Sequence, residues 1–191
     1  MKKRVAILAI VCVTIFLFTS CLYQNNSVEK SIDGMMNALK QYEADSFDRY
    51  ISKEQVPDSI AYGSEHIFNT GIENEDAIYR SMFSKMSWKI ENIESDDTTA
   101  KILLKITTVD LMATLFQVSE ELNVQVADGI ISLDDADYLY YHNVHEKIQA
   151  GTYDVTTFDV ELIMECDVEG KWICILNDSF MHAISGGIMM E

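Results

Sequence analysis

The strongest constraint on the fold is an alternation of apolar and polar side chains with a period of two residues. Residues 98–110 (TTAKILLKITTVD) show it most clearly, and residues 84–94 and 157–167 repeat it. A further apolar stretch, WICILND, follows at 172–178. Because successive side chains of a strand point to opposite faces, these stretches predict an antiparallel sheet with one buried face.

Helical periodicity precedes and separates these strands. Ser27 is a candidate N-cap, Ser132 begins the capping-box-like run SLDD, and Gly151 is placed to end the helix that follows. Helices are predicted over residues 27–44, 45–51, 73–84, 110–125 and 132–150, and from 179 to the glycines at 186–187.

Cys166 and Cys174 flank the last predicted hairpin. With Gly170 in the left-handed position of the turn, Cys166 is expected opposite Trp172, and Cys174 opposite Met164. The two thiols are then diagonal neighbours with Cα atoms about 7–8 Å apart, which is too far for an unstrained disulfide. Two free thiols are expected, although a loop of different length would change the pairing.

The N-terminus is basic at residues 2–4 and then uncharged over 5–18 (VAILAIVCVTIFLF). As a helix this segment would be about 21 Å long, which is short for a bilayer core of about 30 Å. A basic start, a short apolar core and small residues are typical of a secretion signal, and an uncleaved anchor is the alternative.

The sequence FTSC, which ends at Cys21, resembles a lipobox, the cleavage site of bacterial lipoproteins. The resemblance implies that residues 1–20 are a signal peptide and that the Cys21 thiol carries a diacylglyceryl group. Residues 21–26 would then form a polar tether, and residues 27–191 a single domain with a helical insertion at about 110–150. It also implies anchoring at the outer face of the cytoplasmic membrane.

The order of elements predicts an α+β fold in which helices cover one face of a curved antiparallel sheet of about four or more strands. The opening helices, EGKWI at 169–173 and FMHAISGG at 180–187 are similar to small surface lipoproteins of Gram-positive bacteria (Firmicutes). That resemblance implies a cone resembling nuclear transport factor two and cystatin, in a family of largely unassigned function.

Charge narrows the choice of partners. The formal net charge is −17, and loss of the three basic residues in 1–20 leaves 11 basic against 31 acidic residues, or −20. Such acidity argues against a nucleic-acid partner and against broad contact with anionic lipid. The membrane contact is therefore expected through the lipid on Cys21, and no cofactor is predicted.

A cone of this kind offers a pocket between its sheet and its helices, and a fully packed core is the alternative. The apolar strand positions are the candidates for its lining: Met86, Trp88, Ile90, Ile102, Leu104, Phe158, Val160, Leu162 and Met164.

No catalytic residue is predicted. Glu91, Asp159, Glu161 and Glu165 fall on the polar alternate of the strands and are expected to face water, whereas a pKa-tuned carboxylate requires burial. Two strand-end carboxylates remain, and helix capping is their simpler role: Asp110 and Asp178.

The sequence HNVHE holds the only cluster of metal-ligand type, His142, His145 and Glu146. Its spacing matches no zinc motif, its two histidines are expected toward solvent, and no metal is predicted. The neighbouring run DYLYY, residues 137–141, is interpreted as packing. The sequence thus favours a non-catalytic module that binds an apolar small molecule or a partner protein. The alternative is a small-molecule-processing enzyme of isomerase or hydrolase type.

Overall fold

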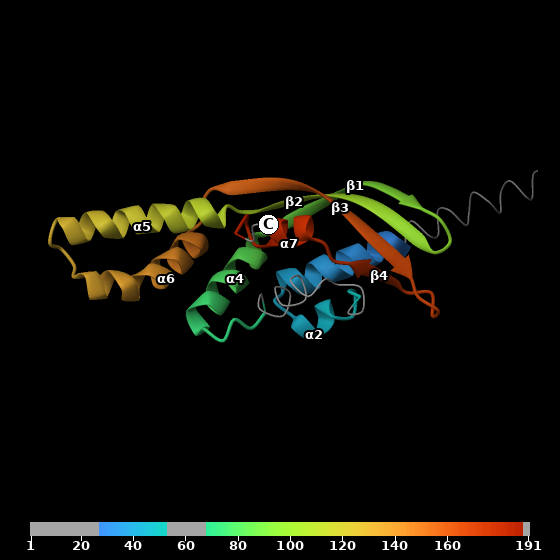
Figure 1. The fold of residues 1–191 in the computed structure, drawn as a ribbon, viewed down its shortest axis with the longest axis horizontal. Coiled ribbons are helices and arrows are strands. Elements are labelled where there is room, and N and C mark those ends of the chain that lie inside the picture. The colour runs from blue at the N-terminus through green and yellow to red at the C-terminus, as the bar shows by residue number, and fades with distance from the viewer. Residues whose placement is uncertain (1–26, 53–67, 189–191) are drawn as a thin grey trace, which may run out of the picture.

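Four antiparallel strands form one curved sheet in the order β1-β2-β3-β4 (Figure 1). The computed structural model describes residues 27–52 and 68–188, so the predicted signal peptide, the lipidation of Cys21 and the tether lie outside the described residues. The strands are β1 (Ser87–Ser95), β2 (Thr99–Val109), β3 (Val155–Cys166) and β4 (Trp172–Ile175).

The predicted alternation is confirmed. In β2, Ile102 and Leu104 are buried, and they pair across the sheet with Leu162 and Val160 of β3. β1 departs from strict alternation, because a bulge between Ile90 and Asn92 shifts its register against β2. A bulge inserts one extra residue into the strand. Ile93 therefore points toward the core, whereas strict alternation from Ile90 would have placed Asn92 there.

Besides helical residues 27–40, the described chain forms five helices. They are α2 (Ala44–Phe47), α4 (Glu73–Lys85), α5 (Leu111–Ala127), α6 (Leu133–Ala150) and α7 (Asp178–Ile184). The fold is therefore α+β, as predicted. The second predicted helix is wrong in length, because the helix ends at Phe47 and residue 51 instead makes a parallel bridge to Cys174.

The helix of residues 27–40 and α7 lie on the same side of the sheet (Figure 1). The two edge strands each hold the first helix by a tryptophan indole. Trp88 of β1 donates to Asp33 at 2.8 Å, and Trp172 of β4 donates to Ser27 at 3.0 Å. Apolar side chains of both layers fill the space between them and make the core, including Met35, Met36 and Phe180.

α5 and α6 form a helical hairpin that extends beyond the end of the sheet (Figure 1). It is an insertion between β2 and β3, and α6 packs against α4 rather than over the sheet. The caps predicted for α5 and α6 are confirmed. Asp110 accepts from the Ala113 amide at 2.9 Å, Ser132 forms a capping box with Asp135, and Gly151 ends α6 at a φ of 75°. At α7 the cap is Asn177 and not Asp178, which is the first helical residue.

The last hairpin has the predicted register. Cys166 pairs with Trp172, Cys174 pairs with Met164, and Gly170 adopts a φ of 80°. Both cysteines are free thiols. Complete burial raises the pKa of Cys174 to about 12, because a thiolate would lose its hydration there.

Candidate functional site

The acidic side chains of the strands lie on the outer face of the sheet, as predicted, and several of them form ion pairs with lysines. Lys105 of β2 lies between Glu91 and Asp159 on the neighbouring strands, at 3.8 and 3.6 Å, and Lys101 pairs with Glu161 at 3.3 Å. These acidic side chains are exposed, so they have the surroundings of a solvated surface.

The nine residues predicted to line a pocket lie on the side of the sheet that the helices cover. Six are buried in the core (Met86, Ile102, Leu104, Val160, Leu162 and Met164), and three pack against it partly buried (Trp88, Ile90 and Phe158). None of them lines either of the two hollows described below.

One of these hollows lies where the helical hairpin meets α4. It has a volume of about 270 Å³, and we call it the tyrosine pocket. This is slightly less than the roughly 300 Å³ at which pockets for drug-sized ligands begin. Its lining consists of Glu75, Ile78, Tyr79, Leu111, Leu115, Tyr140, Tyr141 and Ile188.

Helical spacing explains why these side chains converge. Glu75, Ile78 and Tyr79 are three and four residues apart on α4, and Leu111 and Leu115 are four apart on α5, so each set lies on one helix face. α6 closes the hollow with two consecutive tyrosines, and the residue after Gly187 completes it.

Glu75 brings a carboxylate to this largely apolar site. The Tyr141 hydroxyl donates to its Oε1 at 3.3 Å. Burial raises the pKa of both Tyr79 and Tyr141, and the charge of Glu75 raises each further. The carboxylate therefore acts on phenols from two different helices, and both phenols stay protonated donors at neutral pH.

A hydrogen-bonded cluster joins α4 and α6 beside this pocket. The buried Ser81 hydroxyl lies 3.0 Å from His145 Nδ1 and accepts from Gln149 Nε2 at 2.7 Å. His145 thus faces α4, whereas we predicted that it would face solvent. His142 and Glu146 are exposed, and no group of metal-ligating side chains occurs in residues 27–52 and 68–188.

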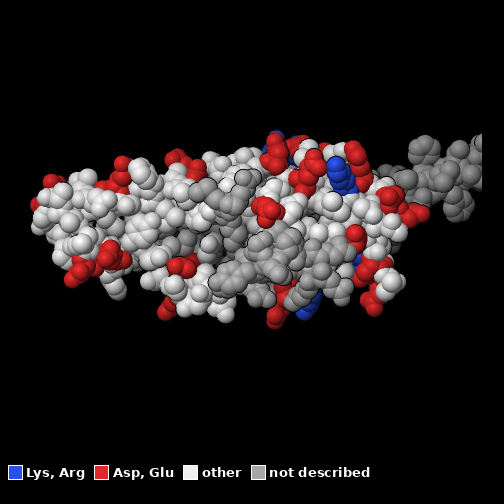
Figure 2. All heavy atoms as spheres, in the orientation of Figure 1, with Lys and Arg blue, Asp and Glu red and all other residues white. Residues whose placement is uncertain are grey.

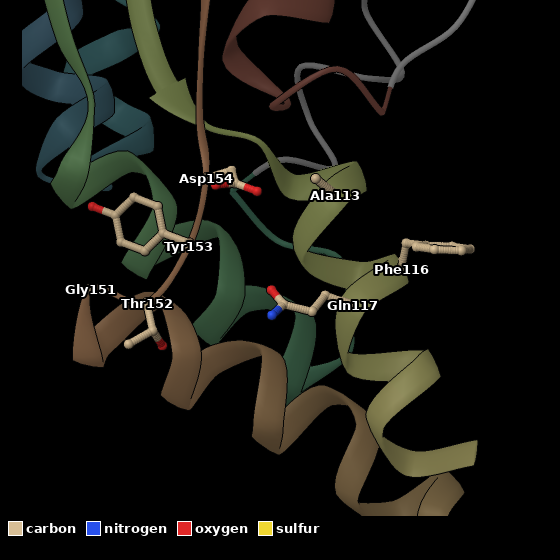
Figure 3. A pocket seen from close by; sticks show the side chains of 7 residues that line it. All are labelled: Ala113, Phe116, Gln117, Gly151, Thr152, Tyr153 and Asp154. Atoms are coloured by element: carbon tan, nitrogen blue, oxygen red, sulfur yellow. The ribbon is translucent and has the colours of Figure 1, made fainter. Parts of the chain in front are cut away.

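The other hollow, of about 460 Å³, lies at the base of the hairpin. Ala113, Phe116, Gln117, Gly151, Thr152, Tyr153 and Asp154 line it (Figure 3). Figure 3 shows Phe116 and Tyr153 on opposite sides, with Gln117 directed between α5 and α6. Its side chains do not converge on one point, so the tyrosine pocket is the better candidate for a specific ligand.

The sequence did not predict the tyrosine pocket. Tyr140 and Tyr141 belong to the run DYLYY, which we had interpreted as packing, whereas Tyr138 of the same run is 80% exposed. The sequence did not mark Glu75 and Tyr79 as site residues. Around them it shows only acidic residues in the first turn of a helix and apolar residues at ordinary helical spacing. Their proximity to α6 depends on how the two helices pack.

The described residues form an α+β protein with a curved four-stranded sheet and a projecting helical hairpin. No protein-family model matches the chain, and no curated protein matches its sequence. A structural match exists to the crystal structure of a "putative lipoprotein (ycdA)" from Bacillus subtilis, with a TM-score of 0.49 and 11% identity. The match covers 75% of this chain and 50% of that one, so this chain spans about half the length of its neighbour.

No membrane-spanning helix occurs among the described residues, since none of the helices there has both the length and the apolar character to cross a bilayer.

Proposed function

We propose that this chain is a lipid-anchored extracytoplasmic protein that binds a small, largely apolar molecule in the tyrosine pocket. The N-terminal sequence supports the proposed location at the membrane, because a basic start, a short apolar segment and the lipobox-like FTSC precede the domain. Two acyl chains on Cys21 would hold the protein at the membrane stably, where one chain would not.

The observation that carries the binding role is the convergence of apolar and phenolic groups from three helices and the C-terminal segment on one hollow. Ligand sites are typically apolar hollows with a few placed polar groups that fix orientation. Ile78, Leu111 and Leu115 supply the apolar walls here, while Glu75 and Tyr141 supply polar groups already joined by a hydrogen bond.

A cone of the nuclear transport factor two type, as found in similar lipoproteins of Gram-positive bacteria, is the family we propose for the fold. A curved antiparallel sheet with helices on one face is consistent with it. An isomerase or hydrolase activity is the alternative function, and Glu75 is the carboxylate that such an enzyme would place at its pocket.

Two experiments test the proposal. Metabolic labelling with palmitate should mark the wild-type chain, and Cys21→Ser should lose both the label and the membrane fraction. An unlabelled wild-type chain would contradict the anchor.

For binding, the full chain is purified from its host in mild detergent, and released small molecules are identified by mass spectrometry. Leu115→Trp should fill the pocket and abolish the co-purifying species. Met112→Trp is the matched control, because Met112 is 46% exposed on the same helix and does not line the pocket. Equal recovery from both variants would contradict the proposed site.

A second candidate is a protein-binding role for the hairpin, because many large apolar side chains on its surface are exposed. They are Met112, Phe116, Val124, Ile130, Leu133 and Tyr138. Scattered exposed side chains are common, but a cluster on one projecting element favours an interaction surface. A photo-crosslinking probe placed at a position next to Phe116 should capture one defined partner at a saturable level in intact cells. Phe116→Glu in the same chain should abolish this capture.

A further inference from the structure

The geometry points to an organic cation as the ligand of the tyrosine pocket: an amine or quaternary ammonium group on a short stem. This inference rests on the proposed function, since it names the chemistry of a ligand at that same site.

The first support is the aromatic lining. Tyr79, Tyr140 and Tyr141 line a hollow of about 270 Å³. The rings of Tyr140 and Tyr141 have centroids 5.4 Å apart and planes at 79°, so they form two walls of a corner. Aromatic faces attract cations through the ring quadrupole, and cages of such rings are a common way to bind quaternary ammonium groups.

The second support is the half-buried carboxylate of Glu75. It accepts a hydrogen bond from Tyr141, and among the described residues no Lys, Arg or His lies within ion-pair distance of it. A carboxylate away from bulk water attracts a cation more strongly than one at an open surface. A ligand cation in the pocket would supply the charge that the described protein residues do not.

The third support is the local field. The hairpin, residues 111–150, carries seven acidic side chains and a single basic one, Lys147, which pairs with Glu121 at 2.9 Å. Figure 2 shows acidic groups over the hairpin, and no basic group on that face of it. Such a field raises the local concentration of cations and repels anions.

The test uses the full chain in non-ionic detergent at low ionic strength, titrated calorimetrically with choline. The comparison probe is dimethylbutanol, in which a carbon replaces the charged nitrogen without changing the shape. We expect saturable choline binding at one site and binding of the neutral isostere that is at least tenfold weaker.

Matched variants locate the effect. Glu75→Gln should weaken choline binding about tenfold, whereas Glu73→Gln removes the same charge from an exposed position of the same helical turn and should leave it unchanged. Tyr140→Phe keeps the aromatic face and should bind nearly as wild type, while Tyr140→Leu should bind about fivefold more weakly.

Equal affinity for choline and dimethylbutanol, or equal effects of Glu75→Gln and Glu73→Gln, would overturn the inference. A third outcome is that dimethylbutanol binds, that Leu115→Trp abolishes this binding, and that choline does not bind. In that case the cation inference fails while the binding function stands. If neither probe binds, the inference is also overturned, and the molecules co-purified with the chain decide the proposed function separately.

Discussion

Gly186 is the glycine on which the position of the pocket most depends. It follows α7 at a φ of 65°, is buried, and its carbonyl accepts from the Leu111 amide at 3.2 Å. An alanine Cβ there would lie 2.6 Å from the Val109 carbonyl oxygen and 2.9 Å from the Leu111 Cβ. The C-terminal segment must therefore move away from the start of α5, and it would carry Ile188 out of the pocket.

The expected cost of Gly186→Ala has three parts. The left-handed conformation costs about 1–2 kcal/mol for a residue with a Cβ, loss of the Leu111 hydrogen bond about 0.5–1.5 kcal/mol, and the overpacking about 1–3 kcal/mol. Together they destabilise the fold by about 2.5–6.5 kcal/mol, a large share of the roughly 5–15 kcal/mol of a typical domain.

Gly151→Ala is the control, because Gly151 has a φ of 75° but nothing within 4 Å of its added Cβ. It should cost only the conformational part, about 1–2 kcal/mol. Urea unfolding followed by circular dichroism measures both variants. Losses that agree within about 0.5 kcal/mol, the usual size of context effects, would refute the close contact at Gly186.

Three further predictions test the surroundings of the site. Iodoacetamide at mildly alkaline pH should label Cys166 in the folded chain and spare Cys174, whose pKa burial raises to about 12; rapid labelling of both, read by mass spectrometry, would contradict the buried hairpin. The Ser132 hydrogen bonds lower the pKa of Asp135, so its carboxylate stabilises the fold above the unfolded pKa of about 4 and loses this effect as pH falls through the folded pKa. The difference in unfolding free energy between wild type and Asp135→Asn should therefore shrink in acid, and a constant difference would argue against the capping box. Ser81→Ala removes a hydroxyl that two α6 side chains contact and should cost about 1–3 kcal/mol by urea unfolding, whereas no loss would mean that the cluster does not join the helices.

Local patterns predicted much of the fold. The alternation in residues 98–110 predicted β2, which has a neighbouring strand on each side. Successive side chains of a strand point to opposite faces of the sheet, so the pattern has a period of two residues. The glycines at 151 and 170 marked a helix end and a turn, since only residues tolerant of positive φ suit those places. The register of Cys166 and Cys174 followed from placing Gly170 in the left-handed position of the turn.

The bulge in β1 could not be predicted in this way. It lies between Ile90 and Asn92, where the sequence shows only that the alternation weakens. The cap of α7 was displaced by one residue, because Asn177 and Asp178 are both good capping residues and the choice depends on where β4 ends.

The tyrosine pocket was also beyond local patterns. Its walls combine α4, α5, α6 and the C-terminal segment, and Glu75 lies 66 residues from its partner Tyr141. Helical periodicity indicates which face of a helix is apolar, but not which other helix that face meets. The strand residues that are possible pocket lining are instead buried in the core or packed against it, as the alternative of a packed core predicts.

The most direct test of the account is a search for nuclear Overhauser contacts between the methyl protons of choline and selectively labelled tyrosine rings of the full chain. We predict contacts to the rings of Tyr140 and Tyr141 and none to Tyr138, which is on the same helix but 80% exposed and outside the pocket. Contacts to Tyr138 alone, or to no tyrosine, would contradict the assignment of the tyrosine pocket as the ligand site.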